Sequence, residues 1–92
     1  MIDKLAELAG RFRSRAADQA AALEQALEDG NDNVLAEHAH KLAGSAALFG
    51  FRDLGELAAE VERLIGTADR ASARTHAAEL AARLRSLAYT VG

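Results

Sequence analysis

Residues 33–50 read NVLAEHAHKLAGSAALFG, and their apolar residues recur at steps of three and four. The members of this stripe are Leu35, Ala39, Leu42, Ala46 and Phe49. Such spacing places the side chains on one face of an α-helix, where they can be buried together. Gly50 follows the stripe, and glycine is the residue best suited to the turn that ends a helix. The stretch therefore predicts an amphipathic helix with one buried face and one face in solvent.

The rest of the chain repeats this helical spacing in three further segments. One long helix is expected from Ile2 to Glu28, with the stripe Leu5, Leu8, Phe12, Ala16, Gln19 or Ala20, Leu23 and Leu27. Another helix follows Gly50, with the stripe Leu54, Leu57, Ala58, Val61, Leu64 and Ile65. The last helix carries the stripe Ala77, Leu80, Leu84, Leu87 and Val91.

Short polar segments separate these helices. Residues 29–33 combine Gly30, which can adopt a left-handed conformation, with short polar side chains that can cap the next helix. Gly66 lies near the end of the third helix, and Thr67 or Asp69 can cap the fourth. Four helices with one apolar stripe each can bury these stripes only against one another. We therefore expect an all-α, antiparallel up-and-down four-helix bundle that forms a single domain over residues 1–92.

The composition supports helices and excludes several classes of function. Proline is absent from the 92 residues, and alanine and leucine are the most frequent residue types. The net charge of −3 argues against binding to nucleic acid. Because cysteine is absent, the chain has no thiolate nucleophile, disulfide or Cys-bearing zinc site. No apolar run is long enough for a membrane span or a signal peptide, so we expect a cytoplasmic protein without membrane association.

The helical pattern predicts that His40 is the most exposed of the three histidines. It lies about 160° around the helix from Leu42, and therefore faces solvent. Its neighbours on the same face all have minimal side chains, and they are Ala36, Ala43, Gly44 and Ala47. The imidazole is thus expected in a bare patch that another protein can reach.

The other two histidines have simpler interpretations. His38 lies about 40° from the Leu42 direction and is expected to be a partly buried structural residue. His76 begins the last helix and is interpreted as a surface or helix-terminal residue. Because a lone exposed histidine is most often only a surface residue, exposure alone does not make His40 functional.

Gly44 is unusual because glycine inside a helix costs about 1 kcal/mol relative to alanine. It lies one turn after His40 on the same face, where a side chain would crowd any group attached to the ring. The alternatives are a tolerated helix glycine or a close crossing with another helix.

Metal binding and serine–histidine catalysis are not expected. His38 and His40 are about 200° apart on a helix and cannot bind one ion together. Glu37 and His40 form a Glu-x-x-His pair, but di-iron bundles need two such pairs and two further glutamates, all directed inward. Ser45 lies near the core, and no acidic residue is placed to orient His40. We expect no metal and no cofactor on this chain.

Residues 39–46, AHKLAGSA, resemble the active-site motif of histidine-containing phosphotransfer (HPt) domains, which reads H-x-L-K-G-S or H-x-L-K-G-A. The similarity extends from Glu37 to Glu62, where Val61 and Glu62 match an apolar–Glu pair of the family. The flanking helices agree with the family's four-helix bundle. One residue departs from the pattern, because Ala43 stands where the family usually has lysine. Lys41, a lysine in some members, can supply positive charge instead.

The resemblance implies that His40 carries a phosphoryl group, most readily on Nε2, and exchanges it reversibly with an aspartyl phosphate on a response-regulator receiver domain. Gly44 would leave space for the group on the ring, and Lys41 would supply positive charge at the same site. The receiver would bring Mg²⁺, and a hybrid histidine kinase would stand upstream. Neither Gly10 nor Gly30 belongs to a nucleotide-binding motif, so we expect a phosphocarrier rather than an ATP-dependent kinase.

We expect the receiver to dock as a transient partner on the His40 face of a monomer. The apolar contacts would come from Ala36, Ala43, Ala47, Leu48 and Phe51, and the polar rim from Glu37, Lys41 and Arg52. For Leu48 the alternative is packing against a neighbouring helix. Two other functions stay open, namely a non-catalytic interaction bundle, which Ala43 favours, and an RNA-binding bundle, which the net charge disfavours.

Overall fold

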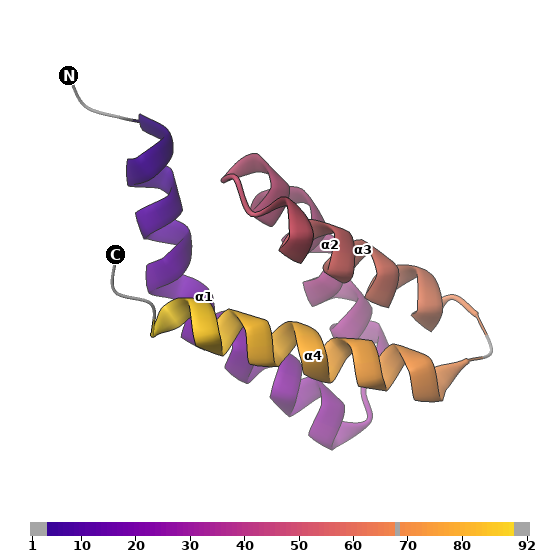
Figure 1. Ribbon diagram of the computed structural model, residues 1–92. Helices are drawn as coiled ribbons and strands as arrows, with labels where there is room; N and C mark the ends of the chain where they lie inside the picture. Colours follow the sequence, from indigo (N-terminus) through magenta and orange to yellow (C-terminus); the bar gives the residue numbers. More distant parts are fainter. Residues whose placement is uncertain (1–3, 68, 90–92) are drawn as a thin grey trace.

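The computed structural model describes residues 4–67 and 69–89 and contains four α-helices (Figure 1). They are α1 (Lys4–Asp29), α2 (Asp32–Leu48), α3 (Arg52–Ile65) and α4 (Arg70–Ala88). No strand occurs in these residues. Each helix packs against the next one in the chain, and α4 returns to pack against α1. This closed order confirms the predicted four-helix bundle.

The core is built from the leucine and alanine stripes of all four helices. Its largest fully buried side chains are Leu23, Leu35, Leu42, Leu80, Leu84 and Val61. In α2 the predicted stripe is buried as far as Ala46, and Phe49 follows the helix as a half-buried C-cap. Alanines between the leucines let the helices approach one another closely, since a methyl group adds little width to a helix.

The helix α1 extends beyond the bundle at its N-terminal end (Figure 1). Leu5, predicted to belong to the buried stripe, is 56% exposed, because the first turns of α1 project past the other helices. From Phe12 to Leu23 the stripe is buried, with Ala20 rather than Gln19 in the core, and its last member, Leu27, is half-buried against the core. Ile2, the predicted start of the first helix, and the predicted stripe residue Val91 lie outside the described residues.

The connections between helices use the predicted glycines and caps. Gly30 and Gly50 have φ of 65° and 92°, which L-residues with side chains rarely adopt. The Asn31 side chain accepts a hydrogen bond from the Val34 backbone N–H and caps α2. At α4 the cap is Asp69, which accepts from the Ser72 N–H at 3.0 Å. This hydrogen bond holds the pKa of the Asp69 carboxyl below its usual range.

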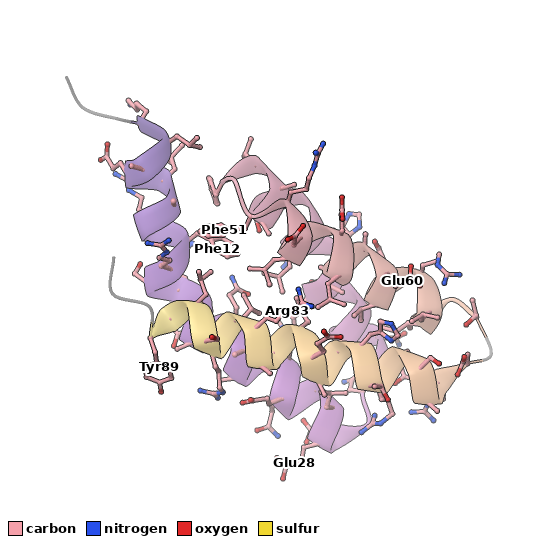
Figure 2. All side chains as sticks on the ribbon, viewed as in Figure 1. Phe12, Glu28, Phe51, Glu60, Arg83 and Tyr89 are labelled. Atoms are coloured by element: carbon pink, nitrogen blue, oxygen red, sulfur yellow. The ribbon has the colours of Figure 1, made fainter. Side chains whose placement is uncertain are left out.

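A cluster of three aromatic rings joins α1 to the turn between α2 and α3. The rings of Phe12 and Phe51 lie side by side (Figure 2) and stack with their centroids 5.0 Å apart. The centroid of the Phe49 ring lies 6.0 Å from that of Phe12. Because Phe49 and Phe51 flank Gly50, this contact holds the α2–α3 turn against α1.

Candidate functional site

The helix α2 directs His40 away from the core. The His40 side chain is 75% exposed, whereas Leu42 and Ala39 on the opposite face are buried. The structure therefore confirms the solvent-facing position predicted for this imidazole. The ring atom Nδ1 lies 2.8 Å from Oε2 of Glu62, which α3 presents from the neighbouring helix.

The contact with Glu62 determines which ring nitrogen is available for chemistry. An ionised carboxylate only accepts hydrogen bonds, so the proton of the neutral imidazole resides on Nδ1 and is donated to Glu62. The other ring nitrogen, Nε2, then carries the lone pair. Among the described residues Nε2 makes no hydrogen bond, and the His40 side chain is largely exposed to solvent.

The expectation that no acidic residue orients His40 is wrong. Glu62 is 22 positions away in the sequence, and the packing of α3 against α2 brings it to the ring. The only sequence signal for this contact was the apolar–Glu pair Val61–Glu62 in the family resemblance. Ser45 is half-buried on another side of α2, so a serine–histidine pair remains unsupported.

Small residues surround His40, but they are not equivalent. Gly44 and Ala47 are exposed, while Ala36 is half-buried. Ala43 is also half-buried and packs against the core. A Cβ added to Gly44 would meet nothing within 4 Å, which rules out a close helix crossing at this glycine. The space beside the imidazole is therefore open.

The charged residues predicted to surround the site lie around its edge. Lys41 Nζ is 3.4 Å from Glu37 Oε1, an ion pair along the outer face of α2. Arg52 is exposed at the first turn of α3. Because exposed ion pairs are weak, Lys41 can exchange Glu37 for another anion at little cost.

The two large apolar residues predicted for the partner surface differ in position. Leu48 is 72% exposed, so the alternative that it packs against a neighbouring helix is wrong. Phe51 is half-buried, and its ring stacks on Phe12. Only part of the Phe51 ring is left for a partner to contact.

The remaining histidines take no part in this site. His38 is half-buried, as predicted. His76 is also half-buried, and its Nδ1–H donates to the Ser72 carbonyl at 2.7 Å within α4. In residues 4–67 and 69–89 no three His, Asp or Glu side chains are grouped closely enough to hold a metal ion.

A shallow groove of about 440 Å³ lies between α1 and the end of α2. Its walls include Leu8, Phe12, Ser45 and Phe49. Ser45 on α2 lies about 140° around the helix from His40, and Phe49 follows the end of α2, so the groove opens on another side of the bundle. This groove is therefore separate from the His40 surface.

Comparison with known protein families matches the Hpt domain over residues 7–91. Comparison with curated proteins and with solved structures gives no significant match. Among the described helices, none combines the length and the apolar character that crossing a membrane requires.

The open space at Gly44 leads to a stability prediction. We expect Gly44→Ala to raise the free energy of unfolding by about 0.5–1 kcal/mol, because alanine loses less backbone entropy in a helix. Gly10→Ala, which also has open space around its Cβ, is the reference for this effect on α1. Urea denaturation followed by circular dichroism measures both changes. A loss of stability at Gly44 alone would show that a neighbour does fill this space.

Proposed function

Because the chain belongs to the Hpt domain family over nearly its whole length, we propose that His40 is its phosphoacceptor. Membership of this family indicates a phosphotransfer-type role in two-component signalling. The observation that carries the proposal is the geometry of His40, whose exposed ring is bound through Nδ1 to Glu62 and leaves Nε2 free. The donor and acceptor of the phosphoryl group would be aspartates of response-regulator receiver domains, with a hybrid histidine kinase upstream.

The proposed reaction needs no base to remove a proton from the nucleophile. The Nε2 lone pair attacks the phosphorus of an aspartyl phosphate in line with the bond to aspartate. The Nε2–P bond forms as the P–O bond breaks, and the electron pair of that bond leaves with the aspartate carboxylate. The proton stays on Nδ1, so the positive charge that develops on the ring faces the Glu62 carboxylate.

The reverse reaction uses the same contact. An aspartate carboxylate of a receiver attacks the phosphorus, the Nε2–P bond breaks, and its electron pair returns to the ring as the Nε2 lone pair. The ring leaves as neutral imidazole because Nδ1 already carries a proton. Mg²⁺ held by the receiver would neutralise charge on the phosphoryl oxygens.

The surface around His40 fits a transient protein partner. Gly44, Ala47 and Leu48 offer exposed, mostly small apolar groups that let a second protein approach the ring. The Glu37–Lys41 pair and Arg52 lie on α2 and α3 at the edge of this surface. An apolar centre with a polar rim is typical of protein interfaces.

A second candidate function is an interaction bundle that binds a kinase or receiver without carrying phosphate. It is favoured by Ala43, which leaves the position of the family's usual lysine without a charge, and by the pairing of Lys41 with Glu37. The two functions differ in one measurable respect, the covalent phosphorylation of His40.

His40→Gln is expected to abolish phosphate acceptance and to leave thermal unfolding nearly unchanged, because the exposed ring contributes little packing. The protein is incubated with a phosphorylated receiver domain, and intact mass is followed for one acid-labile, base-stable phosphate. His38→Gln, two positions away on the same helix, is the matched control and should still accept phosphate. Labelling of the His40→Gln variant, or no labelling of the wild type by receivers that do label a known phosphocarrier, would contradict the proposal.

Lys41→Ala and Arg52→Ala are expected to slow phosphotransfer without abolishing it, since each removes a possible charge partner and keeps the nucleophile. The effect should be larger for Lys41, which is next to His40 in the sequence. Initial rates at sub-saturating receiver provide the measurement. Rates equal to wild type for both variants would mean that the receiver supplies all of the charge stabilisation.

The Gly44 series should separate transfer from stability. Phosphotransfer is expected to fall in the order Gly44, Gly44→Ala, Gly44→Gln, because a longer side chain one turn from His40 obstructs the phosphorylated ring or the partner. Rates are compared per folded molecule, with the folded fraction taken from the denaturation curves. Unaltered transfer in Gly44→Gln would show that clearance beside the ring is not needed.

A further inference from the structure

Gly55 on α3 lies so close to α2 that a Cβ at this position would require its neighbours to move by a few tenths of an ångström. A Cβ built on this residue would lie 3.1 Å from the carbonyl oxygen of Ala43 and 3.2 Å from both the backbone nitrogen and the Cβ of Ala47. Gly55 is buried, although it is part of the first turn of the helix. Two of the three contacts are with backbone atoms of α2, which cannot rotate away as a side chain can.

This close contact distinguishes Gly55 from the other glycines in the described helices. At Gly10 and Gly44 the position that a Cβ would occupy has no neighbouring atom within 4 Å, so alanine would fit at either. Glycine in a helix costs about 1 kcal/mol relative to alanine. The close contact explains why glycine occurs at Gly55 despite this cost, because a methyl group would keep α3 from approaching α2 as closely.

The contact at Gly55 is aligned with the pair formed by His40 and Glu62. Gly55 and Glu62 are seven residues apart on α3, and Ala47 and His40 are seven residues apart on α2. Seven residues make about two turns, so each pair lies on one face of its helix, about 10 Å apart along the axis. Because the two helices are antiparallel neighbours, the same α2–α3 seam contains the glycine contact at one level and the His40–Glu62 contact at another.

The contact between His40 and Glu62 is made by two partly or largely exposed side chains. Their side chains are 75% and 41% exposed, so surrounding packing does little to hold them. The hydrogen bond of 2.8 Å is near the ideal length, and an increase of a few tenths of an ångström would take it to the limit of a good hydrogen bond. A wider seam would lengthen this contact unless the Glu62 side chain moved to follow the ring.

We propose that Gly55 is a positioning residue, which lets α3 approach α2 closely enough for Glu62 to hold the proton on Nδ1 of His40. Its role in transfer rests on the proposed function, because a fixed Nδ1–H keeps Nε2 as the nucleophile. The geometric part of the proposal does not depend on phosphotransfer. It is tested by a measurement on the unphosphorylated protein.

The test is the tautomer ratio of neutral His40, measured from the ¹⁵N chemical shifts of its ring in the full chain, with His40→Gln used to assign the signals. Glu62→Ala is the reference and is expected to lower the ratio of Nδ1–H to Nε2–H by about two- to tenfold, the effect of losing one hydrogen bond. Gly55→Ala should lower the ratio part of the way to this reference. Gly55→Leu, a larger wedge in the same seam, should lower it further.

Two controls separate positioning from general loss of stability. Gly10→Ala makes the same chemical change in open space on α1, and should leave the His40 ratio at the wild-type value. The double variant Gly55→Ala/Ala47→Gly removes one of the three close contacts. Its tautomer ratio should therefore lie between that of Gly55→Ala and that of the wild type. Circular dichroism establishes which variants are folded. If Gly55→Leu does not fold, the tautomer ratio of Gly55→Ala alone tests the proposal.

A wild-type tautomer ratio in folded Gly55→Ala and Gly55→Leu would overturn the proposal, even if both variants melt at lower temperature. The same ratio in wild type and Glu62→Ala would overturn it as well, since no proton would then be held by Glu62. Phosphate acceptance by His40 is measured separately, so a failure of the phosphocarrier function is distinguishable from a failure of this positioning role.

Discussion

The close approach of α2 and α3 is the constraint on which the candidate site depends. Small residues line this seam, with Ala43 and Ala47 on α2 facing Gly55 on α3. The turn that joins the two helices contains Gly50 with φ of 92°, and the Phe12 ring stacks on the adjacent Phe51. Each of these features brings the backbones together at the same end of the hairpin. The other end of the seam then holds His40 and Glu62 within hydrogen-bond distance.

The two faces of α2 have separate roles, and this separation suits a small phosphocarrier. Leu35, Leu42 and their neighbours on the inner face supply stability through burial. The outer face carries the His40 imidazole, which contributes little to packing. The ring can therefore be exposed to solvent without weakening the core. In the proposed function, charge stabilisation for the phosphoryl group would come largely from the partner.

The alanine in place of the family's usual lysine is consistent with this packing. Ala43 is half-buried against the core, and its carbonyl oxygen is the nearest atom to the space above Gly55. The nearby lysine, Lys41, lies on the outer face in an ion pair with Glu37. The negative charge that contacts the His40 ring comes from Glu62 on the opposite helix, so the site is organised around the ring proton on Nδ1.

Local features of the site were predictable because they depend on helical periodicity. The stripe through Leu35, Leu42 and Ala46 identifies the buried face of one helix, and His40 is then exposed by its angle on the same helix. Turn glycines such as Gly30 are recognisable because few other residues adopt a positive φ. The resemblance to Hpt domains depends on the same short segment, and the family match over residues 7–91 confirms it.

The four helices, their bundle and the exposure of His40 could therefore be predicted, since they follow from residue types at fixed spacing along each chain segment. The packing of the helices was needed to show that Glu62 contacts the ring and that Gly55, rather than Gly44, lies at a close helix contact. Both glycines are alike in a helical pattern, and Glu62 is 22 positions from His40. Such features depend on the distance and rotation between two helices, which periodicity within either helix does not specify.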